Sequence, residues 1–429
     1  MDSADKSESI EGEGLTPDGD APSGRKLALA LLKLRDFRFA LLGSGVLVFS
    51  FQMRAIVQSW LALELTDSQA WVGAVNGLPA VVSIALSLLG GLAADRFPKR
   101  DILVVMRLGL VGLALVVGYL VAIDIITIWH LLALTLVQGG ITAFTMPAAQ
   151  SIVAELVGRE KMLTAVSLTQ TLSSLGMIVG PALGGFLVGF FGVAPVYFIV
   201  GGIQFLGVVA TALIRSRNVH GGNESKSALS DIADGLLYVR ENSVIRILMT
   251  LNVLGIFAGF MFPLIPVYAR DILDVGEMGF GLMMTAFGLG GVVGTVGLAM
   301  AGNVRRKGLL PIGAGVIWLI GTFVFAFSRE FYLSLAVLAV MGAGGIAYMT
   351  TINAMVQMTI PDELRGRVTS LFSITMQLFP IGYFVGGLLA AAVNNEFALM
   401  VSGIGVMLPV VLVYARSEEF RRQTTADSD

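Results

Sequence analysis

Long apolar runs separated by short polar connections make up most of the chain. A helix needs about 20 mainly apolar residues to cross a bilayer, and twelve runs are of this order. The pattern therefore predicts an all-α membrane protein with 12 transmembrane helices. The runs lie at about 38–63, 71–94, 102–123, 129–154, 162–189, 193–214, 244–269, 279–301, 309–327, 331–358, 368–392 and 397–415.

One longer polar connection divides these runs into two groups of six. It has apolar residues at a helical spacing, Leu229, Ile232 and Leu236 among them, which predicts an amphipathic helix on the membrane surface or, alternatively, one that binds a partner. The acidic N-terminal residues have no apolar run, so they predict a disordered tail rather than a signal peptide. The predicted organisation is a tail at 1–24, a six-helix half at 25–214, a cytoplasmic linker at 215–243, a second six-helix half at 244–415 and a tail at 416–429.

The Lys and Arg residues gather on one side of this layout. With both termini on the same side, that side carries all of the 28 Lys and Arg residues except Arg54, Arg270 and Arg329. Cytoplasmic connections are enriched in Lys and Arg. The distribution therefore predicts that both termini are cytoplasmic, and an odd number of helices would destroy the segregation.

Composition excludes several other classes of protein. Charged residues make up 14% of the chain and hydrophobic ones 55%, whereas about 25% of an average soluble domain is charged. The chain has no Cys and two His, so thiol chemistry and zinc sites are not expected. The net charge of −2 favours no nucleic-acid partner, and no phosphate-binding G-x-x-x-x-G-K-[ST] loop occurs. We expect no enzymatic activity, no cofactor and no metal.

The two groups of six runs look like repeats. Shifting the second half back by 202 residues places three glycines of the eleventh run on three of the fifth, and a shift of 208 places 279–281 on 71–73. Such repeats are typical of secondary transporters, which bind substrate between the halves near the middle of the membrane. A chance match between glycine-rich helices is the alternative. The matched glycines are Gly180 with Gly382, Gly184 with Gly386, and Gly185 with Gly387.

Two segments carry a family resemblance. Residues 91–100 read G-L-A-A-D-R-F-P-K-R, which resembles the G-x-x-x-D-R-x-G-x-R/K signature of the major facilitator superfamily, with Pro98 in place of the usual Gly. The fifth run resembles the signature of the drug-exporting antiporters in that superfamily, although Ser167 stands where an earlier Gly is expected. The signature residues in this run are Gly176, Gly180, Pro181, Gly184 and Gly185.

Residues 64–68 and 361–367 are similar to the bacterial efflux branch that includes macrolide and enterobactin exporters. The resemblance covers about residues 34–415. It implies two pseudo-symmetric six-helix halves in the inner membrane of a bacterium. It also implies alternating access as the mechanism of transport.

The motifs suggest parts of a transport cycle. Asp95 can accept hydrogen bonds from a helix N-terminus, and the neighbouring cations can pair with the other half, although they could also serve topology alone. We expect a cytoplasmic gate formed by Gly91, Asp95, Arg96, Lys99 and Arg100. The glycines and Pro181 of the fifth run predict a closely packed, bendable helix, which in exporters limits leakage.

Two prolines predict a distortion of the seventh run. Pro263 and Pro266 lie about one turn apart, so a kink is expected near the outer end of this helix. We interpret the segment as part of an outer gate.

Polar residues within the runs are candidates for the substrate cavity. The acids all fall in tails, connections or helix ends, and Arg54 is the cation that lies well inside a run. It either contacts substrate or a gating partner, or is satisfied by carbonyl groups or outer carboxylates. Hydrogen bonding between helices is the alternative role for the others. The candidates are Gln52, Arg54, Gln58, Asn76, Gln138, Asn252, Asn353, Gln357 and Gln377.

These observations favour a secondary active exporter of hydrophobic or amphipathic small molecules. Thr135 stands where many related antiporters have Arg, three residues before Gln138 and Gly139. Together with the lack of a carboxylate in the middle of a run, this leaves coupling to protons open. The alternative is a facilitator or importer of a siderophore, lipid or other small solute without direct proton coupling. The expected partners are a small-molecule substrate, the lipid bilayer and, in the coupled case, protons, with a monomeric chain.

Overall fold

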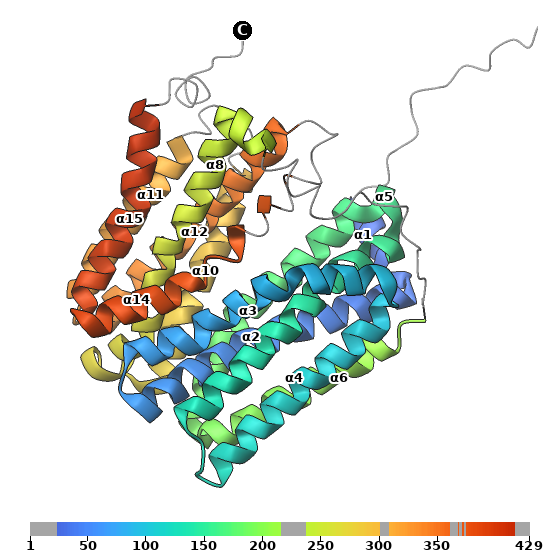
Figure 1. Ribbon diagram of the computed structural model, residues 1–429, viewed down its shortest axis with the longest axis horizontal. Helices are drawn as coiled ribbons and strands as arrows, with labels where there is room; N and C mark the ends of the chain where they lie inside the picture. The colour runs from blue at the N-terminus through green and yellow to red at the C-terminus, as the bar shows by residue number, and fades with distance from the viewer. Residues whose placement is uncertain are drawn as a thin grey trace, which may run out of the picture.

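The computed structural model describes residues 24–215, 237–300, 309–360, 368, 371–372 and 375–416, which form helices joined by short connections (Figure 1). We call α1–α6 the first half and the remaining elements the second half. The first half contains α1 (Gly24–Lys33), α2 (Arg35–Thr66), α3 (Gln69–Arg96), α4 (Lys99–Ala122), α5 (Ile128–Phe191) and α6 (Val193–Ala212). The second contains α8 (Ser243–Leu254), η1 (Gly255–Leu264), α9 (Ile265–Val267), η2 (Tyr268–Ile272), α10 (Gly276–Met300), α11 (Leu309–Phe327), α12 (Phe331–Thr359), α14 (Ile381–Ala392) and α15 (Asn395–Arg416).

Eleven stretches of these helices are long and apolar enough to cross a membrane. They coincide with eleven of the predicted runs. The remaining run, 368–392, contains the shorter apolar helix α14, and part of it lies outside the described residues. The N-terminal tail, most of the linker and the C-terminal tail also lie outside them, so twelve helices and cytoplasmic termini stay predictions.

The fourth and fifth runs belong to one continuous helical element, α5, which contains two membrane-spanning stretches, Ile128–Val157 and Thr164–Phe191. The connection expected at about 155–161 is itself helical, because it consists mainly of residues with good helix propensity. The chain reverses its direction between these two stretches. Trp129 packs against Trp71 at the start of α3, with ring centroids 4.9 Å apart, and Gly185 lies against Gly281 near the start of α10, so both ends of α5 reach the same end of the molecule.

The seventh run is irregular, as its prolines predict. The α-helix ends at Leu254 and continues as the 3₁₀ helix η1, the short α9 and the π-helix η2. Pro263 lies in η1 and Pro266 in α9. Neither proline can donate a backbone N–H, so a regular α-helix cannot continue through them. The distortion begins earlier than expected, at Gly255, and continues to Ile272, so it extends from the middle of the run to its outer end.

The two halves meet along two seams that repeat the same contact. In one seam, a Cβ atom added to Gly185 of α5 would lie 2.8 Å from the Cα of Gly281 in α10. In the other, a Cβ atom added to Gly387 of α14 would lie 3.2 Å from the Cα of Gly73 in α3. Gly185 and Gly387, and Gly73 and Gly281, are the pairs that the sequence shifts place on one another. The contacts therefore agree with a repeat of six-helix units.

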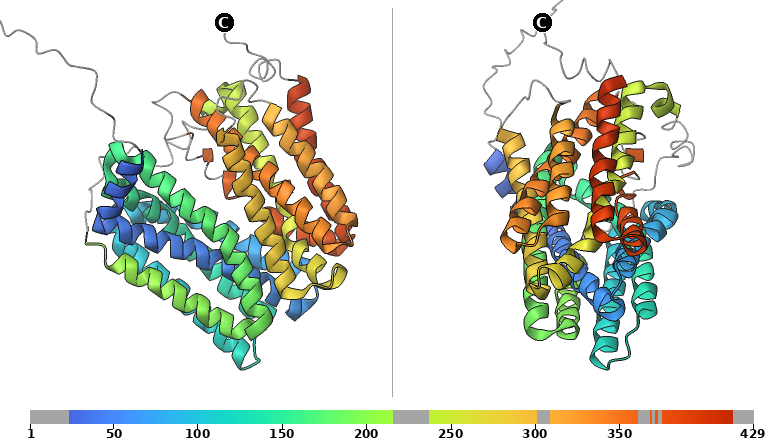
Figure 2. Two further views of the ribbon diagram at one scale, coloured as in Figure 1. Left: turned by 180° about the vertical axis from the view of Figure 1, so that it is seen from behind. Right: turned by 90° about the vertical axis from the view of Figure 1, so that its left-hand side faces the viewer.

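Both seams lie toward the end of the molecule where α2 ends and α3 begins. We call this the junction end. There, Gln69 Nε2 of the first half donates to Asn395 Oδ1 of the second at 3.1 Å. Toward the opposite end, which we call the terminal end, the helices of the two halves diverge (Figure 2). Helix α1 lies at this end, with the buried side chain of Leu31 packed against α2 and α5. The charge distribution predicts that the terminal end faces the cytoplasm.

Candidate functional site

A cavity of about 440 Å³ lies between the two halves. Residues of α2, α3 and α5 line it on one side, and residues of η1, α10, α11, α12, α14 and α15 on the other. Cavities of about 300–1,000 Å³ are typical of sites for drug-sized ligands. The space is therefore large enough for a small organic molecule, and both halves would contact it.

The second half contributes an aromatic wall, by which we mean Phe262, Phe287, Trp318, Phe379 and Tyr383. Phe262 is at its centre and stacks on Tyr383 with ring centroids 5.0 Å apart. Its ring also makes edge contacts with Phe287 at 5.4 Å and Phe379 at 5.7 Å, and Phe287 meets Trp318 at 6.3 Å. Neighbouring rings hold one another in place, so the aromatic wall offers a preformed apolar surface.

The first half contributes amides and a hydroxyl to the same cavity. Asn76 Nδ2 donates to Ser59 Oγ at 3.0 Å and to the Val72 carbonyl at 2.8 Å. Ser59 Oγ donates in turn to the Ala55 carbonyl at 2.8 Å. Gln52 also lines the cavity, and within the described residues its amide has no hydrogen-bond partner. Gln52 is therefore the polar group best placed to bond a ligand.

Two of the predicted cavity residues, Gln52 and Asn76, line this space. Arg54, Gln58 and Gln138 instead line a second, small cavity inside the first half. A hydrogen bond links the residues that line the two cavities, because Gln58 Nε2 donates to Asn76 Oδ1 at 3.2 Å. The helical spacing of Arg54 and Gln58 indicated one face, and the structure places them on it, but the face turns toward α4, α5 and α6.

The other four candidates lie in the second half. Asn252 is buried and its amide donates to Thr375. Gln377 accepts a hydrogen bond from Ser83 of the first half at 3.5 Å. On α12, Asn353 is exposed and Gln357 is half-buried. The proposed roles of these four residues in substrate binding therefore stay predictions.

The predicted cytoplasmic gate lies at the terminal end. Asp95 and Arg96 are exposed, and a Cβ atom added to Gly91 would meet nothing within 4 Å. Lys99 pairs with Glu155 of α5, and Arg100 donates to the Ala212 carbonyl and lies 3.7 Å from Asp101. These partners all belong to the first half, so in this conformation Lys99 and Arg100 bond within their own half.

Three signature glycines of α5 face α2. Gly176 lies against Val48 and Phe49, Gly180 against Gln52, and Gly184 against Met53. A Cβ atom added to Gly180 would be 2.7 Å from the Cβ of Gln52. Close packing of these helices therefore sets the position of Gln52 in the cavity.

The other two signature residues face the second half. Pro181 lines the cavity, and its carbonyl oxygen would lie 2.7 Å from a Cβ atom added to Gly281. Gly185 forms the seam with α10 described above. One motif therefore packs α5 on its own half through one face and on the opposite half through another.

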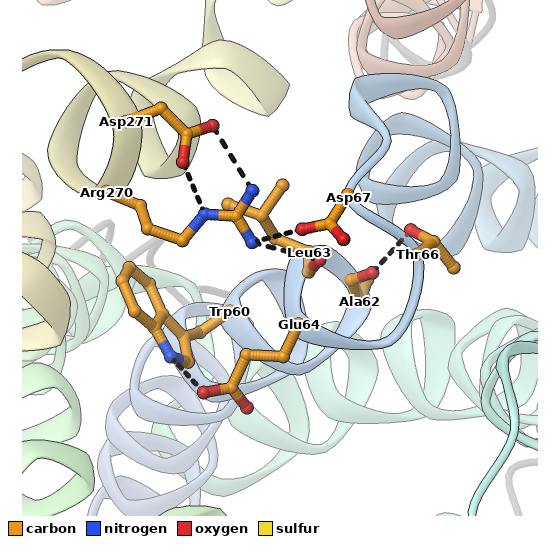
Figure 3. A network of polar contacts seen from close by, with 8 residues as sticks. All are labelled: Trp60, Ala62, Leu63, Glu64, Thr66, Asp67, Arg270 and Asp271. Atoms are coloured by element: carbon orange, nitrogen blue, oxygen red, sulfur yellow. Dashed lines mark hydrogen bonds and ion pairs between the residues drawn. The ribbon is translucent and has the colours of Figure 1, made fainter.

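A polar network that the sequence did not indicate joins the halves at the junction end (Figure 3). Arg270 Nη1 lies 2.9 Å from Asp67 Oδ1 across the halves and donates to the Leu63 carbonyl at 3.3 Å. Its Nε also pairs with Asp271 at 2.6 Å. Nearby, Trp60 Nε1 donates to Glu64 at 2.9 Å. The available signal was that Arg270 is one of two cations on the predicted outer side.

Replacing Arg270 by alanine is expected to favour separation of the halves at the junction end about two- to fivefold. A partly exposed ion pair contributes about 0.5–1 kcal/mol, and the arginine side chain here is 26% exposed. The measurement is the rate at which a thiol reagent labels a cysteine introduced at Asn395. The chain has no Cys, so the introduced residue is the single thiol that the reagent can label. Arg329→Ala is the matched control, because Arg329 pairs with Glu396 inside the second half. Equal acceleration in both variants would contradict a latching role.

Comparisons with known proteins agree with this architecture. Residues 27–428 match the family described as transmembrane secretion effectors. The multidrug efflux pump Tap of Mycolicibacterium fortuitum is 26% identical over 393 residues, which cover 86% of this chain and 90% of that protein. The multidrug resistance protein MdtG of Proteus mirabilis is 24% identical over 338 residues, covering 76% and 80%.

Solved structures share the fold at low sequence identity. A POT family transporter has a TM-score of 0.72 and 12% identity, with 90% of this chain and 96% of that chain covered. A bacterial homolog of the human lysosomal transporter Spinster has a TM-score of 0.68 and 13% identity, covering 96% and 100%. The nucleoside transporter NupG has a TM-score of 0.66 and 14% identity, covering 94% and 100%.

Proposed function

The chain belongs to the transmembrane secretion effectors of the major facilitator superfamily, and from this premise we propose that it exports hydrophobic or amphipathic small molecules from a bacterial cell. The observation that carries the proposal is the cavity between the halves. Its aromatic wall suits an apolar ring system, and the Gln52 amide opposite suits a hydrogen-bonding group. Relatives described as multidrug efflux pumps support the direction of transport.

Alternating access is the proposed mechanism. In this conformation the halves are joined at the junction end and diverge at the terminal end. With the terminal end cytoplasmic, a solute would enter the cavity from the cytoplasm. Release outside would then require separation at the junction network and closure around residues 91–100, where exposed Asp95 and Arg96 could find partners in the second half.

Coupling to protons would have to use groups outside the cavity. Among the described residues, those that line the cavity include no Asp, Glu, Lys or Arg, so substrate and proton would not compete for one carboxylate there. Glu64, bonded to Trp60 near the junction network, is the proposed carrier for a coupled exporter. The same observation favours the second candidate, a facilitator without proton coupling.

Everted membrane vesicles distinguish these functions. A proton gradient is imposed, and accumulation of a panel of dyes, drugs, siderophores and lipids is measured with and without a proton ionophore. Accumulation that the ionophore abolishes supports the coupled exporter. Equilibration that ignores the gradient supports the facilitator, and the absence of transport across the whole panel would contradict both.

Replacing Phe262 by alanine is expected to weaken substrate binding about tenfold. The substitution removes the central ring of the aromatic wall, and aromatic contacts contribute about 0.5–1.5 kcal/mol beyond their buried area. The measurement is quenching of tryptophan fluorescence by a transported compound, since Trp318 lies in the wall. Phe323→Ala is the control, because Phe323 is exposed on α11 and contacts Phe327. Equal loss of affinity in the two variants would show that this cavity is not the binding site.

A further inference from the structure

Arg54 is a buried cation inside the first half, and no oppositely charged side chain among the described residues pairs with it. Its residue is 8% exposed, its guanidinium donates to Gln58 Oε1, and it lies 5.3 Å from the centre of the Phe51 ring. A charge held in a low-dielectric interior is costly unless an opposite charge accompanies it. The site therefore calls for a negative charge that the described side chains do not supply.

A small cavity adjoins this guanidinium. It lies between α2, α4, α5 and α6 and has a volume of about 20 Å³. A cavity needs about 10–15 Å³ to hold one water-sized particle. The space therefore suits a single small ion or water, and it is too small for a drug-like ligand or for a carboxylate carried on one.

Polar groups with unused hydrogen-bonding capacity line the same cavity. The hydroxyl of Tyr197, which is 1% exposed, and the side-chain oxygen of Gln204, which is 5% exposed, have no hydrogen-bond partner among the described residues. Gln138 also lines the cavity, and no described residue bonds its amide. These groups come from α5 and α6.

The Arg54 guanidinium and the Tyr197 hydroxyl supply N–H and O–H donors to this cavity, whereas the orphaned Gln204 oxygen is an acceptor. The guanidinium retains several N–H groups, and rotating the side-chain amides of Gln138 and Gln204 by 180° would present their NH₂ groups to the cavity in place of their oxygens. A metal cation would be repelled by Arg54, and a neutral water would leave the arginine charge uncompensated. An anion satisfies both the donors and the charge.

We infer that the cavity formed by Arg54, Gln138, Tyr197 and Gln204 binds one small monovalent anion, such as chloride. The anion is the counter-ion of Arg54 and holds α2, α5 and α6 together inside the first half. Binding of the anion is coupled to the central cavity through two hydrogen bonds. Arg54 donates to Gln58, and Gln58 donates to Asn76, which lines that cavity. This inference concerns binding by the first half and stands independently of the transported substrate.

Thermal unfolding of the full-length protein in lipid nanodiscs tests the site. Sodium chloride or bromide replaces sodium gluconate at constant ionic strength, and unfolding is followed by tryptophan fluorescence. We expect a saturable rise of roughly 2–5 °C in chloride and in bromide, because a ligand that binds the native state raises the unfolding temperature. Arg54→Gln should abolish the rise, and Arg329→Gln, which removes a cation outside the site, should keep it.

A second variant covers the case in which Arg54→Gln does not fold. Tyr197→Phe keeps the charge and removes one donor, so the chloride concentration at half-saturation should increase at least about threefold. If the wild-type protein unfolds at the same temperature in chloride and in gluconate, the proposal is overturned. An Arg54→Gln protein that responds to chloride as the wild type does would overturn it too, as would an unchanged half-saturation in Tyr197→Phe.

Discussion

Replacing Gly185 by valine is expected to reduce transport at least tenfold while the protein still folds and inserts. A Cβ atom at this position would lie 2.5 Å from the carbonyl oxygen of Glu277 and 2.8 Å from the Cα of Gly281. Both are backbone atoms of the other half, so neither can move without shifting α10. Overpacking costs about 1–3 kcal/mol, and about 1.4 kcal/mol changes an equilibrium tenfold. The clash arises where the halves meet, so it should disfavour the conformation closed at the junction end.

The control lies one turn further along the same helix. A Cβ atom added to Gly189 would meet nothing within 4 Å, so Gly189→Val should transport as the wild type does. Transport is measured in everted vesicles, and the labelling of a cysteine introduced at Gln69 reports whether the junction end has opened. Faster labelling in Gly185→Val but not in Gly189→Val is expected. Wild-type transport by Gly185→Val would show that the α5–α10 seam need not close.

The hydrophobic pattern predicted the helices well because a bilayer imposes a minimum apolar length on each one. The spacing of glycines in the fifth and eleventh runs also predicted which positions are equivalent, and the structure places Gly185 and Gly387 in equivalent seams. Such positions are readable from sequence because close approach of two backbones excludes a side chain. The interruption of the seventh run was readable for a related reason, since Pro263 and Pro266 cannot donate a backbone hydrogen bond.

The lining of the sites was harder to predict because it depends on how each helix is rotated against its neighbours. Arg54 and Gln58 occupy the face that turns away from the central cavity, whereas Gln52, nearby on the same helix, faces into it. Phe262 lies in a segment that is apolar on every side, so no periodicity marks it as part of an aromatic wall. The pairing of Arg270 with Asp67 joins residues from different halves, and it follows from the folded arrangement rather than from local spacing.

Cross-linking the halves at the junction end is expected to abolish transport reversibly. Gln69 Nε2 and Asn395 Oδ1 lie 3.1 Å apart on opposite halves, and the chain has no Cys of its own. In the double variant Gln69→Cys/Asn395→Cys, a short bifunctional methanethiosulfonate reagent should link the two thiols. Under alternating access, this holds the cavity open toward the terminal end only. Transport in everted vesicles should fall at least tenfold and return when a reductant cleaves the link.

The second half offers a control pair at the same end of the molecule. Arg329 and Glu396 approach to 3.7 Å within that half, so Arg329→Cys/Glu396→Cys should cross-link without joining the halves and should keep its transport. Each single-cysteine variant treated with the same reagent controls for modification alone. Unchanged transport by a fully cross-linked Gln69–Asn395 pair would contradict alternating access through the junction end. In that case solute would have to leave by a route that does not separate α3 from α15.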